Sequence, residues 1–329
     1  MDFENINLTL STSPHVHSPD NTRSIMLDVV IALLPAMLGS IFFFGFRALT
    51  VMAVSVAACV LFEYGYRRLM KKDTTIGDCS AIVTGILLAM VCPATIPYWA
   101  IIIGDFFAII VVKQLFGGIG CNFLNPALAG RAFLFSYPVL MTTWPAVGAS
   151  LKLIGSNVDA VTAATPLASL HQGMLPESSL LDCVIGNVGG SLGETSAILL
   201  LAGFIYLLVR KIISARIPVA YVATVAVLAF LFPRGNDRLL WTAYQVFSGG
   251  LLLGAIFMAT DYATSPVTKW GQVIYGVACG LITFGIRYFG SYAEGVSYAI
   301  LIMNIASSLL DKVGVPRRFG YVKQKKEAE

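Results

Sequence analysis

Charged residues are scarce in this chain. Asp, Glu, Lys and Arg make up 12% of its 329 residues and hydrophobic residues 57%, against about 25% and 45–50% in soluble globular proteins. This composition excludes a soluble enzyme, a disordered protein and a nucleic-acid-binding protein. The net charge of +4 is small and unevenly placed, a pattern that orients membrane proteins. We therefore expect an all-α integral membrane protein in contact with lipid.

Clustered histidine and cysteine are also missing. The three histidines have no partner at metal-ligand spacing, and no two of the six cysteines form a CxxC pair, so neither a zinc site nor a haem is expected. The first 24 residues are polar and lack the basic start and apolar segment of a signal peptide. We predict that they form a cytoplasmic tail.

The rest of the sequence divides into ten apolar runs. A spanning helix needs roughly 20 apolar residues, and runs near that length lie at 26–46, 48–66, 79–95, 97–115, 122–141, 187–209, 218–232, 239–258, 271–288 and 293–310. With the N-terminus inside, sixteen lysines and arginines fall on cytoplasmic segments and five on external ones. This asymmetry predicts about ten transmembrane helices in a bacterial or archaeal cytoplasmic membrane, with both termini in the cytoplasm.

One long polar connection, at about 142–186, separates five runs from five runs. An odd number of spans per half predicts two inverted five-helix halves. A weak echo between the third run, around Thr84, and the eighth, around Gly249, favours the same interpretation. The predicted organisation is a tail at 1–24, a first half at 25–141, an external loop at 142–186, a second half at 187–311 and a basic cytoplasmic tail at 312–329.

Two polar interruptions lie in the first half. The stretch Gly117–Pro126 places Asn122 and Asn125 in apolar sequence, where irregular backbone is tolerated only if protein or a water-filled cavity satisfies it. A tight turn capped by asparagine is the alternative. Arg131 lies inside the next run and must pair or face a cavity. Asp105 is its expected partner, and a purely structural ion pair is the alternative.

Two further stretches lie later in the chain. Oxygen-bearing side chains crowd the inner end of the eighth run, where they suit a flavin, a quinone or a cation, or merely cap a helix; they are Thr260, Asp261, Thr264 and Ser265. The external loop contains Asp159-Ala-Val-Thr162-Ala-Ala-Thr165-Pro166. Thr165 followed by proline is typical of a helix N-cap, and its hydroxyl is also open to a modifying enzyme.

The last stretch resembles the D-x-x-[ST]-[GA]-A-T signature that flavin transferases read when they attach FMN, through its phosphate, to the final threonine. Four other stretches resemble the same family: Ser13–Pro19, the entry to the first run, and the motifs Gly117–Pro126 and Thr260–Pro266. The family comprises the D subunit of the Rnf complex and the B subunit of the sodium-pumping NADH:quinone reductase. The resemblance covers about residues 11–320, and the short N-terminal region favours the Rnf D subunits.

The resemblance implies a subunit, not catalytic alone, of a complex that couples electron transfer between ferredoxin and NAD⁺ to Na⁺ or H⁺ translocation. It implies covalent FMN on Thr165, within a signature that includes Asp159 and Thr162, and electron exchange with a second flavinylated subunit. It also implies a non-covalent riboflavin near Asn122, Asn125 and Thr260–Ser265, with Arg131 among the cofactor-binding residues. The alternative is an inverted-repeat channel or secondary transporter without a redox cofactor.

Overall fold

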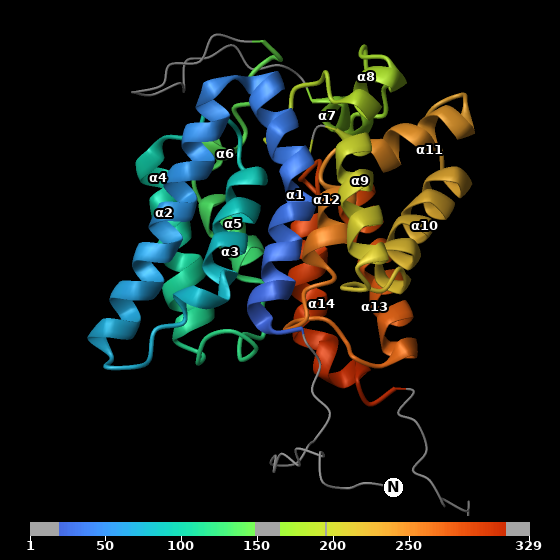
Figure 1. The fold of residues 1–329 in the computed structure, drawn as a ribbon. Helices are drawn as coiled ribbons and strands as arrows, with labels where there is room; N and C mark the ends of the chain where they lie inside the picture. The colour runs from blue at the N-terminus through green and yellow to red at the C-terminus, as the bar shows by residue number, and fades with distance from the viewer. Residues whose placement is uncertain (1–19, 149–164, 195, 314–329) are drawn as a thin grey trace, which may run out of the picture.

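The computed structural model describes residues 20–148, 165–194 and 196–313, and across these residues the chain is helical with no strand. Residues 1–19 and 314–329 of the two predicted tails, together with Asp159 and Thr162, lie outside the described residues, and a helix starts at Thr22, inside the predicted N-terminal tail. The helices form one elongated bundle (Figure 1). α7 (Pro166–His171) and α8 (Leu180–Ile185) lie at one end, here named the α7 end. α1 starts and α14 finishes at the opposite end.

The first half begins with two long helices, α1 (Thr22–Phe44) and α2 (Phe46–Leu69). Asn21 and Ser24 cap α1 reciprocally, with the Ser24 N–H donating to Asn21 Oδ1 at 2.8 Å. Gly45 joins α1 to α2 with φ 71°, a conformation that favours glycine. The half continues through η1 (Ile76–Asp78), α3 (Ser80–Met90), α4 (Tyr98–Phe106), the π-helical η2 (Phe107–Gln114), α5 (Pro126–Leu134) and α6 (Pro138–Met141).

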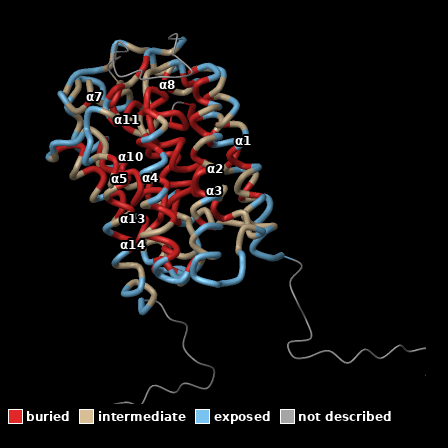
Figure 2. The backbone as a smooth tube through the Cα atoms, turned by 90° about the vertical axis from the view of Figure 1, so that its left-hand side faces the viewer, coloured by how far each residue is buried: buried red, intermediate tan, exposed pale blue. Residues whose placement is uncertain are grey.

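The second half contains α9 (Ala197–Val209), α10 (Arg216–Leu231), α11 (Arg238–Phe247), α12 (Leu251–Leu253), the π-helical η3 (Gly254–Met258), α13 (Lys269–Phe289) and α14 (Val296–Leu310). α1 packs on α9 and α5 packs on α14 across the two halves. α1, α5, α9 and α14 therefore form the junction between the two halves. Buried residues run through the middle of the bundle (Figure 2), and large apolar side chains such as Phe42 and Leu69 lie exposed on its outside.

The predicted run at 79–95 is not one continuous helix. α3 ends at Met90, and the buried segment that follows is irregular because Pro93 and Pro97 remove backbone donors and disfavour helix before them. Its carbonyls are satisfied from elsewhere. The Gly193 N–H donates to Met90 O at 2.8 Å, and Arg47 Nη2 donates to Ile96 O at 2.8 Å.

The predicted run at 239–258 is also not one continuous helix. α11 and the helix formed by α12 and η3 meet at an angle of 60° across Ser248–Gly250. Here Arg287 satisfies the freed carbonyls, with Nη1 donating to Gln245 O at 2.6 Å. The second half therefore holds a helix that is interrupted inside the bundle, whereas in the first half residues 91–97 separate the end of α3 from the start of α4; in each half an arginine satisfies carbonyls of the irregular segment.

The structure supports an all-α membrane protein but not the count of ten spanning helices. Within the described part of the chain, three helices, namely α1, α2 and α13, are long and apolar enough to cross a membrane, and the bent pair of α11 and 251–258 would make a fourth. α3, α9, α10 and α14 are apolar but shorter, and α5 has nine residues. The prediction counted apolar runs, and apolar runs include irregular buried backbone such as 91–97. The inverted relation of the two halves stays a prediction.

Candidate functional site

A cavity at the α7 end contains the predicted attachment residue. Thr165 lines this cavity together with four aromatic side chains, namely Phe135, Trp144, Phe247 and Tyr292. Thr165 is the N-cap of α7, and its Oγ1 accepts the Ala168 N–H at 3.2 Å. The expected cap is therefore present. It uses the Thr165 oxygen as an acceptor, so the hydroxyl proton remains available for substitution.

The polar wall of this Thr165 cavity is a cluster around Arg131, which also lines it. Arg131 Nη1 donates to Glu194 Oε1 at 3.0 Å and to Ser297 Oγ at 3.0 Å, and Nη2 donates to Glu294 Oε2 at 2.6 Å. Glu294 also accepts the Gly250 N–H at the start of α12. Arg131 thus joins α5 to α14 and to the segments that precede α9 and α14.

The prediction that Asp105 pairs with Arg131 is wrong. Asp105, on α4, accepts instead from Ser55 and Cys59 of α2. The carboxylates that pair with Arg131 lie 63 and 163 residues along the chain, so only the tertiary fold brings them together. The alternative for Arg131, a structural ion pair, is present in its contacts with Glu194 and Glu294.

The cluster is close to electrically neutral. Arg287 is a second cation that acts on Glu294, so two carboxylates face two guanidinium groups. Gly250 permits the close packing, because a Cβ there would lie 2.5 Å from Glu194 Oε1 and 2.6 Å from Glu294 Oε1. Arg131 Nε is buried and has no partner among the described atoms.

A second cavity, here named the Asn125 cavity, lies where α3, α5 and η3 meet the start of α1. It brings together four of the predicted residues, namely Asn122, Asn125, Thr260 and Asp261. Thr264 and Ser265 do not line it. The predicted cofactor residues thus fall into two groups at two separate cavities.

The two asparagines position the entry to α5. Asn125 caps α5 through the Leu128 N–H at 3.2 Å and donates to Met258 O at 3.3 Å, which ties α5 to η3. Asn122 donates to Leu124 O at 2.9 Å. The preceding turn needs glycine, since Gly118 has φ 101° and a Cβ there would lie 2.5 Å from Arg67 Nη2. The alternative of an asparagine-capped turn is present, and it leaves both amides at the cavity wall.

Asp261 also has a local structural role. Its carboxylate accepts from Thr264 Oγ1 at 3.2 Å and from the Ala263 N–H at 3.5 Å, within the turn after η3. Burial raises the pKa of the Asp261 carboxyl, and these two hydrogen bonds oppose the rise. Asp261 is thus both a turn residue and a polar group at the cavity wall.

Three acidic residues of these sites were missed. Glu194 and Glu294 belong to the Arg131 cluster, and Glu63 forms a buried pair with Lys113 at 2.7 Å beside the Asn125 cavity. All three stand in or beside apolar runs. A charge in that position needs a partner. The sequence therefore indicates that each of these residues is paired, but it does not indicate with which residue.

Comparison with known proteins shows the family to which the chain belongs. The sequence model of the NQR2, RnfD, RnfE family matches residues 9–320. The chain is 46% identical to the D subunit of the Na(+)-translocating ferredoxin:NAD(+) oxidoreductase complex of Acetobacterium woodii, over 98% of this chain and 99% of the relative. It is 43% identical to the D subunit of the proton-translocating ferredoxin:NAD(+) oxidoreductase complex of Clostridium ljungdahlii, over 95% and 96%. It is 36% identical to the D subunit of the ion-translocating oxidoreductase complex of Actinobacillus succinogenes, over 95% and 98%. The chain therefore belongs to the NQR2, RnfD, RnfE family.

Proposed function

We propose that this chain is a membrane electron-transfer subunit of an ion-translocating ferredoxin:NAD⁺ oxidoreductase complex, and that it carries covalent FMN on Thr165. The observation that carries the proposal is the position of Thr165. The last residue of the flavinylation-like signature lies in the wall of a cavity with aromatic sides and a charged end. The names of its relatives support membership in the complex.

The residues present fit a flavin. A phosphoester to Thr165 Oγ1 replaces only the hydroxyl proton and leaves the oxygen as the acceptor that caps α7. Phe135, Trp144, Phe247 and Tyr292 line the cavity and suit a flat aromatic ligand. Bound FMN would supply one-electron and two-electron transfer, and the chain's own groups orient and enclose it.

The Asn125 cavity is the proposed site of a non-covalent riboflavin. Asn122, Asn125, Thr260 and Asp261 present amide, hydroxyl and carboxylate groups to it, which suit the polar edge and the ribityl hydroxyls of that cofactor. Thr264 and Ser265 support the turn and do not face the cavity. Asp261→Ala is expected to lower turnover per covalent FMN, whereas a pure turn residue would cost only about 1 kcal/mol of stability.

We also propose an orientation in the membrane and a set of partners. We place the α7 end outside a bacterial or archaeal cytoplasmic membrane and both termini inside, with the two halves inverted. The partners are the other subunits of the complex, especially a second flavinylated subunit, together with membrane lipid and, during maturation, a flavin transferase. The sixteen-to-five distribution of basic residues supports this orientation.

The attachment is tested by Thr165→Asn. Asparagine is as good an N-cap as threonine, so α7 should persist while no hydroxyl remains for a phosphoester. The denatured wild-type chain should fluoresce as a flavin band in a gel and carry the mass of FMN less water, and the variant should lose both. Thr268 also N-caps a helix, through the Gly271 N–H at 3.2 Å, so Thr268→Asn is the matched control and should keep the flavin. A flavin peptide that maps elsewhere would refute the assignment.

A passive channel or secondary transporter is the second candidate. The observation that favours it is the broken helix at 248–250, because discontinuous helices inside a bundle are typical of transporter binding sites. Purified chain without any flavin, but with ion flux in vesicles, would support this candidate over the redox subunit.

A further inference from the structure

A line of buried polar side chains crosses the first half between α2, α3 and the helix formed by α4 and η2. Ser55, Cys59 and Glu63 follow one another at intervals of four residues, so they share one face of α2. Asp105 on α4 and Lys113 on η2 face them. All five side chains are buried, and Ser55, Glu63 and Asp105 are each 0% exposed.

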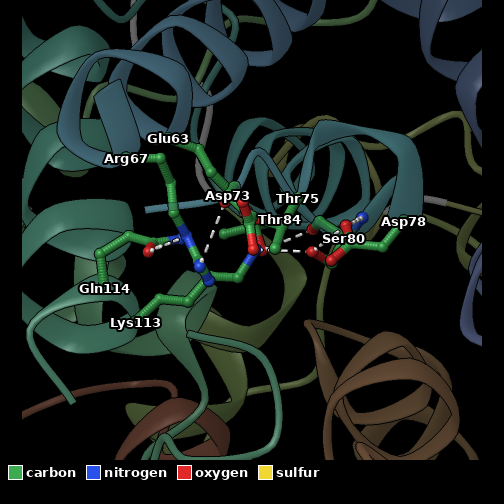
Figure 3. A network of polar contacts seen from close by, with 9 residues as sticks. All are labelled: Glu63, Arg67, Asp73, Thr75, Asp78, Ser80, Thr84, Lys113 and Gln114. Atoms are coloured by element: carbon green, nitrogen blue, oxygen red, sulfur yellow. Dashed lines mark hydrogen bonds and ion pairs between the residues drawn. The ribbon is translucent and has the colours of Figure 1, made fainter. Parts of the chain in front are cut away.

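The Glu63 end of this line is fully partnered. Lys113 Nζ donates to Glu63 Oε2 at 2.7 Å and to Ser80 Oγ at 2.6 Å, and Thr75 donates to Glu63 Oε1 at 2.5 Å. Figure 3 shows these side chains converging, with Arg67 beside them. One carboxylate faces one ammonium group, so the charges cancel. Lys113 and Ser80 also line the Asn125 cavity, so this end of the line reaches that space.

The charge of an ionised Asp105 is not cancelled in this way. Ser55 Oγ and Cys59 Sγ both approach its Oδ1, at 2.8 and 3.2 Å, and Oδ2 is buried with no partner among the described atoms. No lysine or arginine in the described ranges forms an ion pair with it; the salt bridge nearest along the line is that of Lys113 with Glu63. An ionised carboxylate in such surroundings is costly, and buried groups of this kind take up a proton instead.

The hydrogen bonds around Ser55 also favour a protonated Asp105. Ser55 Oγ lies 2.8 Å from Gly85 O and 2.8 Å from Asp105 Oδ1. Both are acceptors when Asp105 is ionised, but a serine hydroxyl carries a single proton. With a proton on Asp105, Oδ1 donates to Ser55 Oγ and the Ser55 hydroxyl donates to Gly85 O. One added proton therefore satisfies both short contacts.

The donor set favours a proton over a metal cation. Hard cations of the Ca²⁺ type take six or more oxygen ligands. The contacts of Asp105 supply one hydroxyl and one thiol, with the Gly85 carbonyl behind the hydroxyl. A thiol is a poor ligand for such ions. The other ionisable groups that act in this region are Cys59, Glu63 and Lys113, along the line, and Cys92 after α3.

We propose that Asp105 is a buried proton-binding site whose proton exchanges with water. Uptake converts the carboxylate to a carboxylic acid with a proton from water, and release reverses the step. No electron is transferred. Asp105 lines neither of the two cavities proposed for flavin, so the site does not depend on either cofactor.

Infrared difference spectroscopy of the intact complex in lipid tests the proposal. At neutral pH the wild type should show a carboxylic-acid C=O band that Asp105→Asn removes, and transfer to D₂O should shift it. Asp237 is an exposed carboxylate that caps α11, and asparagine also caps well, so Asp237→Asn is the control and should keep the band. Ser55→Ala should keep the band but move it to higher frequency, because the acid loses its hydrogen-bond partner.

Three results would overturn the proposal. Identical acid bands in the wild type and in Asp105→Asn would show that Asp105 is ionised. A band that Na⁺ abolishes, and that K⁺ at the same ionic strength does not, would replace the proton site with a sodium site. A band that stays unshifted in D₂O would show a proton without access to water.

Discussion

Removal of the Arg131 guanidinium, by Arg131→Gln, is the sharpest test of the central cluster. The change leaves Glu194 and Glu294 without the donor that bridges them, and their side chains are only 6% and 16% exposed. Breaking a buried ion pair by removing one partner typically costs about 3–5 kcal/mol. We expect a loss of that size in the free energy of unfolding, because the remaining cation, Arg287, acts chiefly on Glu294.

The half-exposed pair of Arg210 and Asp28, in which the Asp28 carboxylate also accepts a hydrogen bond from Tyr206, is the matched control. Its N–O distance is 3.0 Å, as in the pair of Arg131 with Glu194, but the Arg210 side chain is 51% exposed. Arg210→Gln should therefore cost less than about 1 kcal/mol. Unfolding of each purified variant is followed by tryptophan fluorescence in mixed micelles with increasing SDS.

A double variant separates the cause. Adding Glu194→Gln to Arg131→Gln removes one orphaned carboxylate, so the double variant should be more stable than Arg131→Gln alone, with a coupling of about 1–3 kcal/mol. Equal losses for Arg131→Gln and Arg210→Gln, or strictly additive effects of the two cluster changes, would refute the reasoning.

Three further outcomes are expected. Gly118→Ala should lower stability by about 1–3 kcal/mol in the same titration, because φ is 101° and the new Cβ would lie 2.5 Å from Arg67 Nη2; a neutral effect would contradict that geometry. The native thiol of Cys121 is exposed and should react with an impermeant reagent only from the cytoplasmic side, whereas Glu177→Cys should react only from outside; labelling of both from one side would reverse or reject the orientation. Burial raises the pKa of the Asp261 carboxyl in the folded protein. At a pH above that pKa, the ionised carboxyl therefore lowers the stability of the fold, and the lost stability returns as the pH falls and the carboxyl takes up a proton. Asp261→Asn should thus exceed the wild type in stability at neutral pH, with the difference vanishing towards about pH 4, and a difference that does not change with pH would exclude this titration.

The sequence predicted part of the polar lining of the Asn125 cavity. Asn122 and Asn125 were grouped correctly with Thr260 and Asp261 because polar groups in apolar runs have few places to lie. Thr264 and Ser265 were included because they are adjacent in the chain, yet a turn points them elsewhere. Adjacency in sequence was therefore a weaker guide than the need for a polar environment.

Sequence patterns did not predict which residues pair across the bundle. Asp105 and Arg131 were matched because they stand in consecutive runs, and neither contact that Asp105 makes has that spacing. Helix counts failed for a related reason. Hydropathy records whether residues avoid water, and the irregular buried backbone at 91–97 avoids it as well as a helix does, because Arg47 and the 192–193 segment satisfy its carbonyls.

The Arg131 cluster has a consequence for the order in which the chain is made. Arg131 leaves the ribosome before either of its carboxylates, which follow 63 and 163 residues later. Until Glu294 arrives, the nascent first half contains a cation whose final surroundings are dry and whose counter-charge does not yet exist. We therefore expect the two halves to close only when synthesis is nearly complete. A chain truncated before Glu294 should remain open and be a substrate for membrane proteases.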